Sequence, residues 1–317
     1  MCYFDDRDIK VQKGIDRALA VMPDFCREFL LYTNLKLTKL TARSYFYVIR
    51  QFFEYHTERK GIAIKDFTIA DLDQVTTADI EKWLSTFTDK IGINAVIYKH
   101  SVMKTFLAYY YVRREINRNV AEQIIMPHLK EKPIIRLFPD EVKKLLAAVD
   151  PKQRHYLRDY TILFFFLSTG VRLSELIGLD IKHIDLDNAS FTVHRKGGKI
   201  EVLYMTAELQ EQLRVYMNSI DTHNEDAPLF ASEDNPRIAD NTLRDMVKKY
   251  VKKAGIHKKI TPHKLRSTFG TNLYRKTRDI YAVARCLGHS SVNTTKKYYV
   301  AFDEEIKREA IAGFKIA

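Results

Sequence analysis

Apolar side chains recur at helical spacing along the first 110 residues of the chain. The clearest case covers about residues 41–58, where apolar residues at positions i, i+3, i+4, i+7 and i+8 form one stripe: Tyr45, Val48, Ile49, Phe52 and Phe53. Gly61 follows as a helix-ending residue. Similar stripes predict helices that begin near Phe25, Thr77 and Ala95, whereas the first 20 residues show a mixed pattern. The spacing therefore predicts a small all-helical domain whose ordered core begins at about residue 20.

The second half of the chain changes its pattern after a helix that begins at Pro139. The next helix, expected over about residues 154–168, is apolar on several sides and should form the centre of a second core. Short segments rich in β-forming residues follow at 181–186, 191–194 and 201–204, with Lys196-Gly-Gly-Lys199 as the turn between the last two. Helices resume at 207–220 and 241–254. The expected fold is mainly α with a small β-hairpin sheet.

Residues 117–137 separate these two halves. They are polar, contain Pro127 and Pro133 and lack periodicity, as is typical of a linker. We therefore divide the chain into a helical domain at 1–120, a linker at 121–136 and a second domain at 137–317.

Composition narrows the class of partner. Lys plus Arg number 52 against 40 for Asp plus Glu, which gives a formal net charge of +12, and the pI is near 9.4. This excess favours a polyanion as partner. The three cysteines lack any spacing typical of a disulfide framework or a zinc site, and a reducing compartment fits them best. No signal peptide or membrane span is indicated, so we expect a soluble, cytoplasmic protein.

One stretch near the C-terminus combines residue types suited to phosphodiester chemistry. His263 and Arg266 lie three residues apart, so on a helix both can point toward one phosphate. Gly288 ends a short apolar run as a helix-ending residue, and it places His289 on a tight turn. A tyrosine, Tyr298, follows nine residues later and is expected on a further helix.

The motif Thr169-Gly-Val-Arg-Leu-Ser-Glu-Leu lies upstream, and a basic hairpin that carries Lys196 follows it. Together with the stretch from Thr261 to Tyr298, these residues resemble the tyrosine recombinase (phage-type integrase) superfamily, particularly its compact Xer-like and mobile-element members. The resemblance covers roughly residues 20–310. It implies an N-terminal core-binding (SAM-like) domain and a C-terminal catalytic domain that form a C-shaped clamp around DNA.

The resemblance also implies a role for each site residue. Arg172 and Arg266, with their planar donor forks, would neutralise charge on the phosphate in place of metal ions. Tyr298 would be the nucleophile, although the adjacent Tyr299 is the alternative. The leaving 5′ oxygen needs a proton, which the hairpin lysine Lys196 would supply, with Lys199 as the second choice.

Three further assignments complete this site. His263 is similar to the family's general acid/base, His289 resembles the histidine that hydrogen-bonds the scissile phosphate, and Glu175 would orient Arg172 from behind. A phosphotyrosyl bond stores the energy of the cleaved bond, so no nucleotide, metal or other cofactor is expected.

Basic residues on the expected helices and around the site are candidates for DNA contacts, although an ordinary solvated face explains them equally well: Lys39, Arg43, Arg50, Lys99, Lys104, Lys199 and Lys264. The chain after Tyr298 predicts an amphipathic helix at about 302–317 with an apolar strip of Ile306, Ala310, Ile311 and Phe314. In related recombinases this tail docks into a neighbouring subunit. The expected partners are double-stranded DNA with an inverted-repeat core site and, on synapsed DNA, three further copies of a chain that is a monomer when free.

The resemblance is incomplete outside the catalytic set. The linker has Asn119-Val-Ala where Xer-type members often have Asn-Pro, and no room is seen for an additional N-terminal arm-binding domain. Site-specific recombination through a 3′-phosphotyrosyl intermediate and a Holliday junction is the function expected. A type IB topoisomerase-like nicking-closing enzyme and a non-catalytic DNA-binding regulator are the alternatives.

Overall fold

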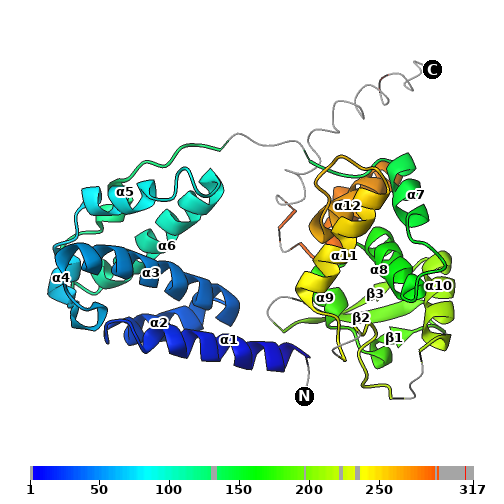
Figure 1. Ribbon diagram of the computed structural model, residues 1–317, viewed down its shortest axis with the longest axis horizontal. Helices are drawn as coiled ribbons and strands as arrows, with labels where there is room; N and C mark the ends of the chain where they lie inside the picture. Colours follow the sequence, from blue (N-terminus) through cyan, green and yellow to red (C-terminus); the bar gives the residue numbers. More distant parts are fainter. Residues whose placement is uncertain are drawn as a thin grey trace. The chain divides into compact units, whose positions relative to one another are not determined.

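The structure, a computed structural model, describes residues 3–129, 134–195, 198–220, 224–232, 236–289, 291–292 and 311. The chain divides into two compact units, Met1–Glu131 and Lys132–Ala317. We call them the N-terminal unit and the catalytic unit and describe each by itself (Figure 1). As predicted, the described residues are mainly helical and contain one small antiparallel sheet.

The N-terminal unit is built entirely from helices among its described residues. Its α-helices and short 3-10 helices are α1 (Tyr3–Leu19), α2 (Cys26–Lys36), α3 (Lys39–Lys60), η1 (Ile64–Asp66), α4 (Ile69–Asp73), α5 (Thr77–Ser85), α6 (Ile93–Val112) and η2 (Val120–Gln123). Helix α3 ends at Gly61, whose φ of 67° is left-handed, as the sequence predicted. Thr68 and Thr76 start α4 and α5 with capping boxes.

Aromatic rings fill the core of this unit. Phe29, Phe46, Phe52, Phe53 and Phe106 are all fully buried, and neighbouring rings meet edge-on or tilted at 5–6 Å. The single tryptophan of the chain, Trp83, is 1% exposed and meets the Phe52 ring at 5.4 Å.

The sequence analysis was wrong about the first 20 residues. They form α1, which packs against α3 (Figure 1). Val11, Ile15 and Leu19 are buried and lie four residues apart, which places them on one face of the helix. The ordered core therefore begins near residue 11, and not at about residue 20.

The catalytic unit has helix α8 at its centre. Its elements are α7 (Pro139–Ala147), α8 (Tyr156–Thr169), α9 (Leu173–Ile177), η3 (Ile181–His183), β1 (Ile184–Asp185), β2 (Ser190–His194), β3 (Ile200–Tyr204), α10 (Ala207–Asn218), α11 (Asp240–Lys253), α12 (Pro262–Thr277) and α13 (Ile280–Leu287). Helix α8 packs against α7, α10 and α12. Its Phe165 and Phe166 are fully buried, so the prediction of a central apolar helix is confirmed.

The sheet has the order β1-β2-β3, and both pairings are antiparallel. The strand expected at 181–186 is only two residues long and corresponds to β1. Ile181 and Lys182 lie outside it because their backbone N–H groups donate to the carbonyls of Ala227 and Glu225. The β2–β3 hairpin pairs His194 with Ile200 at its end. Among the described residues, no helix combines the length and apolar character that a bilayer crossing requires.

Candidate active site

A left-handed turn after α8 delivers the first arginine. Gly170 ends the helix with φ 63°, and a Cβ atom at this position would lie 2.3 Å from Cδ1 of Phe269. Only glycine fits this close approach. The chain then turns so that Arg172 immediately precedes α9.

The carboxylate of Glu175 holds Arg172 in place. Its carboxylate accepts the Arg172 backbone N–H at 2.7 Å and the guanidinium Nη1 at 2.6 Å. Glu175 is 2% exposed, whereas the Arg172 side chain is 35% exposed. The buried carboxylate therefore holds a guanidinium that is still partly exposed to solvent.

The second arginine lies on α12. Pro262 occupies the first turn of this helix, and Arg266 follows one turn later, 4% exposed. Its Nη1 donates to the Gly170 carbonyl at 2.6 Å, and its Nη2 donates to the Leu287 carbonyl. Arg266 thus ties the turn after α8 to the end of α13.

Three arginines donate to consecutive backbone carbonyls at the end of α13. We call these carbonyls, of Cys286, Leu287 and Gly288, the carbonyl turn. Arg172 Nη2 donates to Gly288 O at 2.8 Å, while Arg266 binds Leu287 O. The third is Arg195, which donates to Cys286 O and Leu287 O at 3.2 Å each. Because helix C-termini carry partial negative charge, cations are stabilised there.

Arg195 was missed by the sequence analysis, although it directly precedes Lys196. Its side chain is 5% exposed and pairs with Glu175 at 3.3 Å and with Glu201 of β3 at 3.0 Å. The one available sequence signal was a basic residue at the end of a strand in which Val193 and Phe191 face the core.

Both predicted histidines lie in the electrostatic field of these arginines. Partial burial and the positive charges of Arg266 and Arg172 lower the pKa of His289 to about 4. The same causes, together with Lys264, lower the pKa of His263. Both imidazoles are therefore neutral at neutral pH. Arg172, Arg266, His263 and His289 thus lie close enough for their charges to interact.

Tyr298, the predicted nucleophile, and Lys196, the predicted general acid, lie outside the described residues, as do Tyr299 and the tail from 302 onward except Ile311. Lys199 is exposed on the hairpin, and Lys264 is half-buried beside His263. Among the described residues, no group of three or more His, Cys, Asp or Glu side chains is placed to hold a metal ion.

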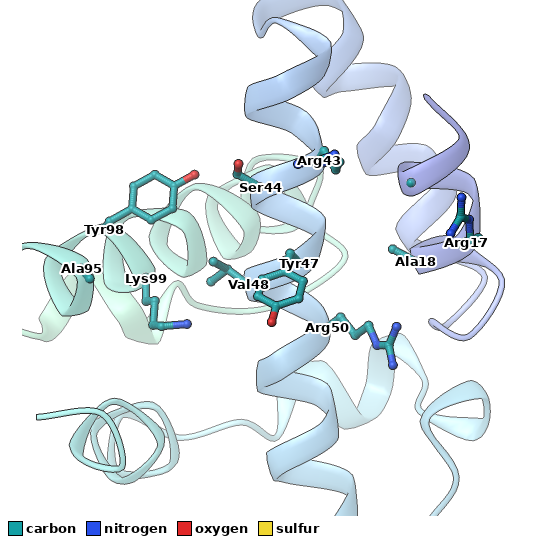
Figure 2. A pocket seen from close by; sticks show the side chains of 11 residues that line it. Arg17, Ala18, Arg43, Ser44, Tyr47, Val48, Arg50, Ala95, Tyr98 and Lys99 are labelled. Atoms are coloured by element: carbon teal, nitrogen blue, oxygen red, sulfur yellow. The ribbon is translucent and has the colours of Figure 1, made fainter. Parts of the chain in front are cut away.

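A second basic feature lies in the N-terminal unit. A pocket of about 710 Å³ lies between α1, α3 and α6. Figure 2 shows basic and polar side chains around it: Arg17, Arg43, Ser44, Tyr47, Arg50, Tyr98 and Lys99. We call it the basic pocket, and it contains three of the residues predicted to contact DNA.

The predicted DNA-contact residues differ in their surroundings. Lys39 and Arg43 are exposed. Lys99 is 8% exposed, bonds Gln51 and lies 4.2 Å from the centre of the Phe87 ring. Lys104 forms an ion pair with Glu122 at 2.9 Å. Arg50 pairs with Glu54 at 2.7 Å within α3.

Comparison with known proteins identifies the family of this chain. The model of the phage integrase family matches residues 136–305. Tyrosine recombinase XerC of Caldanaerobacter subterraneus subsp. tengcongensis is 30% identical and covers 91% of this chain and 86% of its own length. XerC of Pelobacter propionicus is 28% identical and covers 86% and 89%.

Solved structures show the same fold. The XerH site-specific recombinase bound to palindromic difH substrate aligns with a TM-score of 0.68 at 20% identity, over 86% of this chain and 80% of that one. A lambda integrase dimer bound to a core site aligns with a TM-score of 0.66 at 18% identity, over 90% and 76%. The chain belongs to the phage integrase family and is a tyrosine recombinase.

Proposed function

We propose that this tyrosine recombinase exchanges strands between two double-stranded DNA sites in the cytoplasm through a 3′-phosphotyrosyl bond on Tyr298. The observation that carries the proposal is the carbonyl turn, which gathers Arg172 and Arg266 beside two neutral histidines. This combination fits a phosphodiester monoanion whose charge increases as a fifth oxygen approaches phosphorus.

The Tyr298 hydroxyl oxygen attacks phosphorus, forms the P–O(tyrosine) bond and breaks the bond to the 5′ oxygen. The phenol proton passes to His263, which is neutral and can accept it. The departing 5′ oxygen takes a proton from Lys196. Attack of a 5′ hydroxyl from the partner DNA reverses these steps, so the reaction needs no external energy source.

Arg172 and Arg266 supply positive charge at fixed positions. The Arg172 guanidinium donates to Glu175 and to the Gly288 carbonyl, and this partly exposed group has further N–H donors for phosphate oxygens. His289, neutral and one residue beyond the carbonyl turn, donates one hydrogen bond to the same phosphate. Glu175 keeps Arg172 aligned while the charge on the phosphate changes.

A covalent-trapping experiment tests the nucleophile. Tyr298→Phe removes only the reacting oxygen, so we expect normal binding to a nicked suicide substrate and complete loss of the covalent adduct on a denaturing gel. Tyr299→Phe is the matched control and should retain the adduct. The opposite result, with the adduct lost only in Tyr299→Phe, would assign the nucleophile to Tyr299.

We extend the proposal to the N-terminal unit and to assembly. The basic pocket has the charge and aromatic lining expected of a surface that follows a DNA backbone, with Arg17, Arg43 and Arg50 as its phosphate contacts. The tail at about 302–317 would dock into a neighbouring subunit, and cyclic exchange of tails would close a tetramer on two synapsed sites.

A further inference from the structure

Arg195 is fixed at both its backbone and its side chain. Its backbone N–H donates to the Lys199 carbonyl at 2.7 Å, which closes the end of the β2–β3 hairpin. The next residue along the chain is Lys196. The contacts that hold Arg195 therefore determine where the hairpin segment that carries this lysine begins.

The Arg195 guanidinium joins three elements that are distant in sequence. It pairs with Glu175 in the first turn of α9 and with Glu201 on β3, and it donates to the carbonyls at the end of α13. Gly288 leaves space for this arrangement, because a Cβ atom there would lie 2.5 Å from Cζ of Arg195. A planar group with five donors can make all these bonds at once, which a lysine ammonium cannot.

Arg195 shares one carboxylate with Arg172 and has a second carboxylate partner of its own. Glu175 accepts from both arginines, and Glu201 gives Arg195 a second carboxylate at 3.0 Å. Glu201 thereby neutralises much of the Arg195 charge. The positive charges of Arg172 and Arg266 act on His289.

We propose that Arg195 is a positioning residue: by anchoring the end of β2 to the carbonyl turn, it determines where the hairpin segment that carries Lys196 begins. The proposal rests on the function of Lys196 as general acid proposed above. Arg195 does not touch the DNA in this view, because its side chain is 5% exposed and its donors are occupied by the protein.

The test compares two substrates that differ in one atom. One has the ordinary 5′-bridging oxygen at the cleavage site, and the other has sulfur, which leaves without a proton. The readout is the ratio of single-turnover cleavage rates, sulfur over oxygen. General-acid catalysis contributes about 10²–10⁴-fold, so Lys196→Ala should raise this ratio by roughly that factor.

Arg195→Gln should raise the same ratio by about 10-fold or more, because a displaced Lys196 delivers its proton poorly. Arg195→Lys keeps the charge but loses the fork, and an intermediate rise is expected. Glu201→Gln removes one partner of Arg195 from a side chain that is 30% exposed, so it carries the same test if Arg195→Gln does not fold. Arg214→Gln, which removes an exposed guanidinium of α10, is the matched control and should leave the ratio unchanged.

The outcomes separate the two ideas. A raised ratio in Lys196→Ala and in the Arg195 or Glu201 variants supports the positioning role. A raised ratio in Lys196→Ala alone overturns it, however slow the Arg195 variant is, because the defect is then a general one. A normal ratio in Lys196→Ala refutes the general-acid assignment itself, and with it the role given to Arg195.

Discussion

Burial and the arginines proposed to bind the phosphate both favour the uncharged form of the His289 imidazole. Burial lowers the pKa of this imidazole most, and the positive charges of Arg266 and Arg172 lower it further. A phosphate entering the site would reverse the balance, because its negative charge favours the imidazolium. We therefore expect the pKa of His289 to rise when DNA binds.

NMR titration of the histidine ring protons checks this directly. We expect one midpoint near pH 4 in the free protein, absent from His289→Gln and shifted upward by a DNA half-site. The sign for stability follows. Between about pH 4 and pH 6.5 the unfolded chain binds more protons at this position, so the free energy of unfolding falls as the pH falls through this window. A midpoint at pH 6.5 for the ring-proton signal that His289→Gln removes would contradict the assignment.

At the scale of elements, the end of α13 depends on glycine for two separate reasons. Gly288 has φ 59°, and a Cβ atom at this position would lie 2.5 Å from Cζ of Arg195. Gly288→Ala should cost about 1–2 kcal/mol for the backbone alone and should also displace Arg195 and slow cleavage. The measurements are the melting temperature and the single-turnover rate.

Gly255→Ala is the matched control for this prediction. Gly255 lies in the same unit and has φ 67°, but no atom lies within 4 Å of its added Cβ. It should lose a similar backbone term of about 1–2 kcal/mol and retain normal cleavage. Equal cleavage by the two variants would show that the Arg195 contact at Gly288 is unimportant.

The basic pocket makes a prediction about salt. Each phosphate contact contributes about 0.9 to the slope of log affinity against log salt, so Arg17→Gln and Arg43→Gln should each reduce this slope by about one. Fluorescence anisotropy with a duplex half-site measures it. Arg59→Gln, exposed on α3 but outside the pocket, should leave the slope unchanged. Unchanged slopes for both pocket variants would place the DNA elsewhere.

Helices with wide apolar stripes were predictable, whereas α1 was not. Its buried face has one apolar residue per turn, and charged residues occupy much of the remainder, so the pattern gives a weak signal. In the site, Arg172, Glu175, His263, Arg266 and His289 were predictable because each belongs to a short local motif. Arg195 was not, because its partners Glu175 and Leu287 lie 20 and 92 residues away in sequence.

At the scale of the whole molecule, the proposed tetramer requires exchange of the tail between subunits. The chain after Asp303 carries the apolar strip of the expected exchange helix. Truncation after Asp303 should leave a folded protein that binds a half-site but forms no four-subunit complex and completes no strand exchange. Native gels and light scattering on DNA complexes measure this, and Phe314→Asp tests the strip without shortening the chain.

Two other outcomes would change the account of the tail. Normal synapsis and recombination by the truncated protein would mean that the tail is not exchanged between subunits. Unfolding of the truncated protein would mean that the tail belongs to the core of its own catalytic unit.

Trp83 gives the protein a natural fluorescent label on one unit only. It is the single tryptophan of the chain, enclosed by the aromatic core of the N-terminal unit. Its emission should therefore follow the unfolding of that unit alone, while far-ultraviolet circular dichroism sums the helices of both. The ammonium of Lys99 lies 5.8 Å from the Trp83 ring centre and lines the basic pocket. The same emission should then change when a DNA phosphate draws this ammonium away, so binding by the N-terminal unit can be followed without attaching a dye.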